Sequence, residues 1–143
     1  MNAEDIVKKI LDSIYCVRGN LVQGYLESLY EKALIIELQE RGLKVESQVP
    51  IQVNYKGTII GDFKIDLLVE DCVIIEIKAV QKLQVAHELQ LVNYLTIAKK
   101  DIGILVNFGA DKIEVKRKYR LYTPKKKEES LNLSLVSRCD RKE

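Results

Sequence analysis

The chain has 143 residues, of which 47% are hydrophobic and 31% charged, and its net charge is +2. This length suits one domain with a sizeable core, and this composition excludes an intrinsically disordered chain. The three cysteines are odd in number and lack CxxC spacing, which argues against a disulfide scaffold or a structural zinc site. Because the sequence has no secretory signal and no apolar run of transmembrane length, we expect a soluble cytoplasmic protein with no membrane partner.

Hydrophobic periodicity predicts helices first, then strands, with one further helix between strands. The predicted elements, in chain order, are helices over 3–17 and from about 24 or 25 to 41, strands over 43–55, 58–69 and 73–80, a helix over 83–99, and strands over 102–108 and 112–121. We expect a break at residues 18–20, and Pro50 indicates an edge strand or a bulge. The order α-α-β-β-β-α-β-β predicts one α/β domain over residues 1–123, a mixed β-sheet flanked by helices. Residues 124–143 are predicted to form a charged, partly disordered tail.

Residues 73–79 are mostly apolar and β-branched, which predicts a strand buried on both faces in the middle of the sheet. Glu76 and Lys78 interrupt this apolar run. Because side chains alternate along a strand, Glu76 and Lys78 point to the same face. Charges are costly to bury unless they are paired or bound to a metal. The pattern therefore leaves two interpretations, a buried ion pair or a functional site.

Asp66, ten residues before Glu76, favours a functional site. It lies in the preceding predicted strand, and residues 70–72 are short enough for a tight hairpin that brings Asp66 opposite the Glu76 region. Two converging carboxylates repel each other unless a cation lies between them. Their oxygens suit Mg²⁺ or Mn²⁺, and a nearby Lys78 could orient or activate a water molecule. This spacing predicts a metal-dependent hydrolase site.

Glu27 lies near the start of the second predicted helix, on the same face as Tyr30 and Glu31. A glutamate in a first turn interacts favourably with the helix dipole. The alternative is that Glu27 reaches the predicted metal site directly or through water. The sequence leaves both roles open.

Polar side chains also lie on one face of the helix predicted over 83–99. His87, Gln90 and Tyr94 are spaced so that they share this face, and an amide and a phenol four residues apart can bind a phosphate or hold the lysine. A lone histidine is more often a hydrogen-bonded structural residue. The opposite face carries an apolar stripe that needs cover from the first helix or from a second subunit, which leaves a homodimer open. The stripe consists of Val85, Leu89 and Val92.

Basic residues concentrate near the end of the predicted domain. Residues 112–127 contain eight basic side chains and one acidic one. Such a stretch suits a nucleic-acid phosphate backbone, and Arg117, Lys118 and Arg120 are the candidate contacts. A solvated strand and tail would have the same composition.

Several motifs resemble a known group of enzymes. Asp66 followed by Glu76-Ile77-Lys78 resembles the PD-(D/E)xK nuclease superfamily, in which a strand aspartate precedes a (D/E)-x-K strand. Within it, the chain is most similar to the GxxExxY protein family, whose motif is here Gly24-Tyr25-Leu26-Glu27-Ser28-Leu29-Tyr30. The similarity extends over residues 5–122, and residues 90–94 also resemble the QxxxY motif of helicase-associated nucleases. Ile65 stands where the superfamily name has proline.

This resemblance implies a PD-(D/E)xK nuclease-like fold and a divalent metal, Mg²⁺ or Mn²⁺. By similarity, Asp66 and Glu76 would ligate the metal with the carbonyl of Ile77. Glu27 would complete the metal shell.

The resemblance also implies roles for three further residues. Lys78 would orient the attacking water and stabilise the developing charge, and Gln90 and Tyr94 would hold the substrate phosphate or Lys78. The first hypothesis is accordingly a metal-dependent nuclease that acts on DNA or another nucleic acid. The alternative is a catalytically idle module of the same fold that binds nucleic acid or a partner protein. A purely structural domain would leave Asp66 unexplained.

Overall fold

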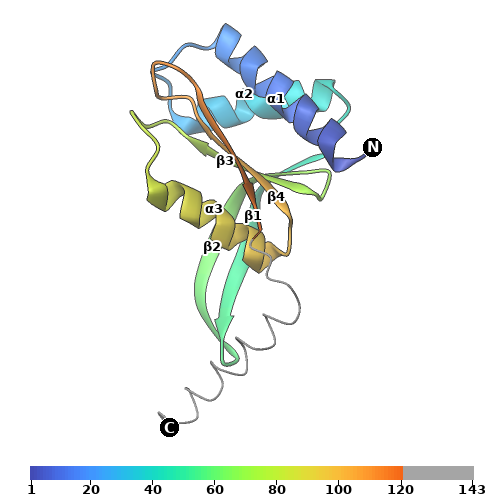
Figure 1. Ribbon diagram of the computed structural model, residues 1–143, viewed down its shortest axis with the longest axis vertical. Coiled ribbons are helices and arrows are strands. Elements are labelled where there is room, and N and C mark those ends of the chain that lie inside the picture. Colours follow the sequence, from blue (N-terminus) through green and yellow to red (C-terminus); the bar gives the residue numbers. More distant parts are fainter. Residues whose placement is uncertain (121–143) are drawn as a thin grey trace.

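The computed structural model describes residues 1–120, which form helices and strands in the predicted order (Figure 1). The elements are α1 (Ala3–Asn20), α2 (Glu27–Glu40), β1 (Val45–Tyr55), β2 (Thr58–Val69), β3 (Val73–Lys78), α3 (Val85–Ala98), β4 (Ile102–Asn107) and β5 (Glu114–Tyr119). The predicted tail over residues 124–143 lies outside the described residues. Within residues 1–120, no helix is long and apolar enough to cross a membrane.

The first helix is longer than predicted. It continues to Asn20, so the predicted break at residues 18–20 is wrong. Arg18, in its last turn, donates to the carbonyl oxygens of Phe108 and Ala110 at 2.6 Å each. This contact with a segment about 90 residues away stabilises the last helical turn, in which Gly19 is unfavourable.

The five strands form one mixed sheet in the order β1-β2-β3-β4-β5. The pairs β1–β2, β2–β3 and β4–β5 are antiparallel, and β3–β4 is parallel, with α3 as the crossover between these two strands. Pro50 lies in β1 at the edge of the sheet, as predicted, which is where proline is tolerated in a strand. The apolar strand β3 lies in the centre, as its composition indicated.

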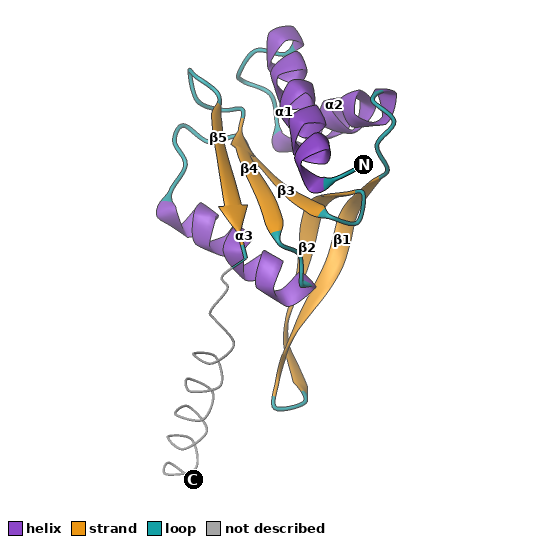
Figure 2. Ribbon diagram, turned by 45° about the vertical axis from the view of Figure 1, so that its right-hand side comes forward, coloured by secondary structure: helices purple, strands orange, loops and turns teal. Residues whose placement is uncertain are grey.

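Helices cover the sheet on both faces (Figure 2). α1 and α2 pack on one face, where Val73, Ile75 and Ile77 join their core. α3 packs on the other face, against Ile74 among others. Because side chains alternate along a strand, Glu76 and Lys78 share the α3 face with Ile74. Glu76 and Lys78 therefore lie beneath α3, away from the first two helices.

The two-stranded β1–β2 ribbon turns its faces over at the position of Gln48 and Asp66. Residues of one face therefore contact different helices before and after this point. On one side of this point Leu67 packs with the core of α1 and α2, whereas on the other side Val49 and Ile65 pack with α3. Gln48 and Asp66 are not paired with each other, although the residues on either side of them are, and Gln48 has a positive φ of 52°. A non-glycine residue in this region is uncommon and concentrates at functional sites. Beyond the turnover, the hairpin extends past the rest of the sheet (Figures 1 and 2).

The end of β3 is held by the segment that follows β4. The backbone N–H of Phe108 donates to the Lys78 carbonyl at 2.9 Å, and the buried Asn107 accepts from the N–H of Val80 at 3.0 Å. Gly109 lies so close that a Cβ atom there would meet backbone atoms of Val80 at 2.5 Å. A side chain at position 109 would therefore push apart the two segments that position Lys78.

Gly109→Ala is expected to destabilise the protein by roughly 1–3 kcal/mol, because a methyl group has no space against the Val80 backbone. Thermal unfolding should show a loss of several degrees in Tm. Gly19→Ala is the matched control, since a Cβ at Gly19 would meet nothing within 4 Å, and its Tm should stay the same or rise slightly. Equal Tm values for wild type and Gly109→Ala would contradict the close approach.

Candidate active site

Asp66 and Glu76 meet where the β2–β3 ladder ends. The last ladder pair is Leu67 with Ile75. Beyond it, the backbone N–H of Asp66 donates to Glu76 Oε1 at 3.1 Å, and the N–H of Ile77 donates to Asp66 Oδ2 at 2.8 Å. The two carboxylates thus replace backbone carbonyls as acceptors and lie side by side. The structure confirms the predicted convergence of these two residues.

Glu76 is almost completely buried, with 4% of its surface exposed. Burial, and then the negative charge of Asp66, raise the pKa of Glu76 to about 8, and the positive charge of Lys78 opposes this shift. At neutral pH the Glu76 carboxyl therefore mostly keeps its proton in the metal-free protein. Within residues 1–120, Glu76 and Lys78 do not approach closely enough to form an ion pair. The ion-pair interpretation of this strand does not hold.

A third carboxylate, that of Glu31 in α2, is linked to Asp66 through the side chain of Gln48. The side-chain amide of Gln48 donates to both carboxylate oxygens of Glu31, at 3.0 and 3.2 Å, and lies 3.5 Å from Asp66 Oδ1. Burial raises the pKa of Glu31, and the charges of Asp66 and Glu27 add to this effect. Glu27 itself is exposed, at the first residue of α2. Its predicted place in the metal shell stays a prediction.

Sequence reasoning missed Glu31 and Gln48. Glu31 follows Glu27 by four residues, so the two share a helical face, and this shared face was the signal that could have included Glu31. Gln48 had no such signal, because its position depends on the turnover of the β1–β2 ribbon.

The glycine and tyrosine of the Gly24–Tyr30 motif have structural roles. Gly24 has a φ of 115°, which few other residues adopt. The fully buried Tyr30 donates its hydroxyl to the Val22 carbonyl at 2.6 Å, and its ring stacks on Phe108 at 4.6 Å between centroids. These contacts fix the loop before α2 and the approach of α2 to the sheet. They therefore help to set where the side chains of α2 lie relative to the sheet.

From the other side, α3 places Tyr94 next to the carboxylate pair. Tyr94 is only 7% exposed, and its pKa is raised by burial and then by the charges of Glu76 and Asp66. Gln90, one turn earlier, lines the same pocket as Tyr94. The Nδ1 atom of His87 accepts a hydrogen bond from the backbone N–H of Gln84 at 2.9 Å, in a capping box at the start of α3. His87 is therefore a structural residue.

The donor atoms at this site suit a hard divalent cation. Asp66 and Glu76 offer carboxylate oxygens side by side, and a cation would offset the repulsion that, after burial, raises the pKa of Glu76. In the described part of the chain, no group of three or more His, Cys, Asp or Glu side chains is arranged to hold a metal. Mg²⁺ commonly binds through only one or two carboxylates, with water and substrate phosphates as further ligands. The residues present therefore fit Mg²⁺ or Mn²⁺.

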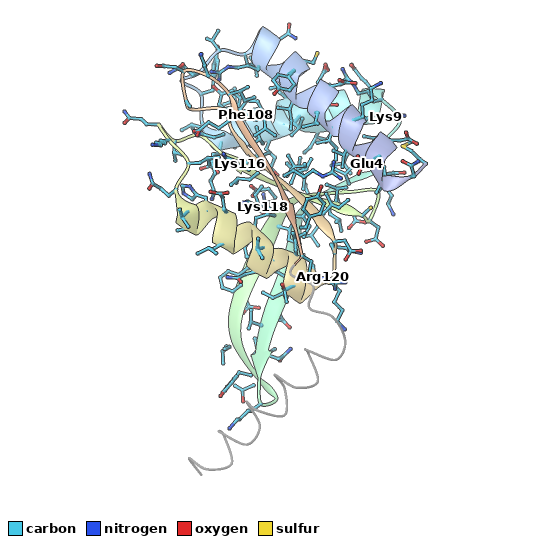
Figure 3. The ribbon with its side chains drawn as sticks, viewed as in Figure 1. Glu4, Lys9, Phe108, Lys116, Lys118 and Arg120 are labelled. Atoms are coloured by element: carbon cyan, nitrogen blue, oxygen red, sulfur yellow. The ribbon has the colours of Figure 1, made fainter. Side chains whose placement is uncertain are left out.

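The three predicted nucleic-acid contacts follow one another along β5 and its end, where Figure 3 labels Lys118 and Arg120. Each forms an ion pair within the chain. Arg117 pairs with Glu4 of α1, Lys118 with Glu88 of α3 at 2.5 Å, and Arg120 with Asp101 at 2.9 Å. Arg117 and Lys118 thus reach helices on opposite faces of the sheet. Their contact with nucleic acid stays a prediction, and it would require these ion pairs to open.

Comparisons with known proteins agree with this fold. A family model described as the PD-(D/E)XK nuclease superfamily matches residues 4–118. Among solved structures, one titled "Crystal structure of SSO0001" matches with a TM-score of 0.54 and 20% sequence identity, over 68% of this chain and 52% of that chain. At this identity the likeness concerns the fold alone, and the matched part is about half of that chain's length. A search of curated proteins finds no significant match.

Proposed function

Because this chain belongs to the PD-(D/E)XK nuclease superfamily, we propose that it is a divalent-metal-dependent nuclease that hydrolyses phosphodiester bonds of DNA. The observation that carries this proposal is the meeting of Asp66 with the buried Glu76, with Lys78 on the same face of the central strand. Two adjacent carboxylates destabilise the metal-free protein, and a bound cation removes that cost. More narrowly, the motif over residues 24–30 supports placing the chain in the GxxExxY family.

The proposed roles follow from chemistry. Asp66, Glu76 and the Ile77 carbonyl would hold the metal, with Mg²⁺ or Mn²⁺ as the candidates. When bound, such an ion polarises the phosphate and lowers the pKa of a bound water. The Lys78 ammonium orients the attacking water and stabilises the negative charge that develops on the phosphate oxygens. Tyr94 lies near the carboxylates and can position the substrate phosphate or Lys78.

We further propose that Glu31, rather than Glu27, supplies the third carboxylate. Gln48 bridges Glu31 and Asp66, whereas Glu27 is exposed one helical turn away. In the metal-free protein, the Gln48 amide separates two carboxylates that would otherwise repel each other directly. A cation at Asp66 would attract the Glu31 carboxylate toward the same point.

Glu31→Gln is expected to weaken Mg²⁺ or Mn²⁺ binding by about 10- to 100-fold, the usual effect of losing a residue that supports a metal site. Glu27→Gln is the matched control and should bind the metal like wild type. The measurement is Tm as a function of metal concentration, which gives the Kd without a substrate. The reverse order of the two variants would assign the third carboxylate to Glu27.

The function itself is tested by incubating the protein with single-stranded, duplex and branched DNA and with RNA, in Mg²⁺, Mn²⁺ or EDTA. We expect cleavage of DNA that needs the metal and disappears in Asp66→Asn prepared in parallel. Equal cleavage by Asp66→Asn would point to a contaminating nuclease. If the protein binds nucleic acid but cleaves none of these substrates, it is the idle binding module of the alternative hypothesis.

A further inference from the structure

A groove of about 620 Å³ runs between the β1–β2 hairpin and α3. Its walls are mainly apolar, and Ile60, Phe63 and Leu89 remain 63%, 42% and 58% exposed. Gln90 and Asn93 add amide groups to the α3 side. None of the residues that line the groove is charged. Exposed apolar surface of this extent, bounded by polar groups, is typical of a binding site and not of ordinary protein surface.

The groove is continuous with the candidate active site through Tyr94. The Tyr94 ring lies 5.8 Å from the Phe63 ring, tilted by 44°, and both rings line the groove. The same Tyr94 side chain packs in one buried cluster with Ile65, which precedes Asp66 in β2, and Ile74, which lies two residues before Glu76 in β3. Gln90, predicted to act on the substrate, also lines the groove. A chain whose phosphate lies at the carboxylates would therefore place a neighbouring unit along Tyr94 and Phe63.

We propose that this groove binds unpaired nucleobases, so that the substrate of the nuclease proposed above is single-stranded nucleic acid or a strand with bases freed from a duplex. This inference rests on the proposed function, because a base in the groove belongs to a substrate only if the adjacent site cleaves phosphodiester bonds. A nucleobase has flat apolar faces and polar edges, which match the rings and aliphatic side chains of the groove and its two amides. In a duplex these faces are stacked on other bases and cannot reach Phe63.

Because no charged residue lines the groove, the groove suits a nucleobase and not a phosphate backbone. Binding of the backbone depends on lysine and arginine side chains, and none lines the groove. A base that enters the groove would leave its phosphate at the mouth, toward the carboxylate pair. A second copy of this chain would be the competing occupant, since Leu89 and Val85 of α3 are both exposed. α1 does not cover these two residues, because it packs on the other face of the sheet.

The test measures binding by fluorescence anisotropy, with no cleavage, in EDTA and in Ca²⁺. The probes are a short oligothymidine strand, an abasic strand of equal length and charge, and a duplex. We expect the oligothymidine to bind most tightly. Phe63→Leu should weaken this binding by roughly 5- to 100-fold, the range for loss of one base–aromatic stack, and leave the abasic strand unaffected. Phe63→Tyr should restore it, and Tyr15→Leu, which removes an exposed ring on α1, should have no effect.

Three results would overturn the inference. The first is equal affinity for the oligothymidine and abasic strands, or no binding of any strand in either buffer. The second is an oligothymidine affinity that Phe63→Leu does not change. The third is a dimer in light scattering that Phe63→Leu or Leu89→Asp dissociates, because a second copy would then occupy the groove. The proposed function is tested separately. If the protein binds unpaired bases through Phe63 but never cleaves DNA in Mg²⁺ or Mn²⁺, base binding by the groove stands and the nuclease function is wrong.

Discussion

Lys78→Ala is expected to lower the single-turnover rate of DNA cleavage by about 10²–10³, the usual effect of removing one preorganised charge from a developing transition state. Lys78 lies on the α3 face of β3, two residues after Glu76, and its carbonyl is fixed by the N–H of Phe108. Its backbone is therefore rigid, and its ammonium acts on Glu76 without forming an ion pair. Lys78→Arg should not restore the rate, because a planar guanidinium does not replace a compact point charge.

The same variants should keep their fold and their metal response. Tm with and without metal is the measurement, and Lys8→Ala, which removes an exposed lysine of α1, is the matched control for the loss of one positive charge. Full activity in Lys78→Ala would remove this residue from the mechanism. A large fall in Tm would instead show that the loss of activity has a structural cause.

Glu76→Gln is expected to make the metal-free protein more stable near pH 8 than the wild type. The Glu76 pKa rises from 4.5 to about 8 on folding. Below pH 4.5 this carboxyl is protonated in both states, so it contributes no pH dependence. Between pH 4.5 and about 8 the unfolded state loses the proton while the folded state keeps it, so the stability of the folded state falls as pH rises. The total loss is on the order of a few kcal/mol, and above about pH 8 this dependence ends.

The measurement is Tm against pH for wild type and Glu76→Gln in EDTA. The difference between the two proteins reports on Glu76 together with its coupling to Asp66, since the other groups are common to both. The wild type should lose stability relative to Glu76→Gln as pH rises through this interval. A constant difference in Tm would show that the Glu76 carboxyl does not take up a proton on folding.

Added Mg²⁺ or Mn²⁺ should reverse this loss in the wild type. An ion at 100 times its Kd stabilises the folded state by about 2.7 kcal/mol, which corresponds to several degrees in Tm. The effect should increase with pH, because metal binding requires the ionised carboxylate. Asp66→Asn should lose the metal response, and its metal-free form should melt no lower than the wild type, since one repelling charge is gone. Equal metal responses in both proteins would contradict the proposed site.

Local sequence patterns were sufficient to predict the order of the elements and the meeting of Asp66 with Glu76. Helix and strand periodicities depend only on neighbouring residues, so each helix and strand was found within a few residues of its observed bounds. The pairing of Asp66 with Glu76 could also be predicted, because a tight turn between two adjacent strands leaves almost no freedom in their register. Lys78 then followed from the alternation of side chains along β3.

The other features of the candidate site, and the ion pairs of the basic stretch, depend on contacts between distant residues that only the tertiary structure shows. Glu27 and Glu31 share one helical face, and the proposed choice of Glu31 depends on how α2 approaches the sheet, where Tyr30 stacks on Phe108 from far along the chain. Gln48 reaches Asp66 only because the β1–β2 ribbon turns over at that pair, and its positive φ has no local signal such as glycine. The ion pairs of Arg117 with Glu4 and of Lys118 with Glu88, which would have to open for contact with a phosphate, also arise only on folding. In each case the deciding partner is distant in sequence, so no short-range periodicity could identify it.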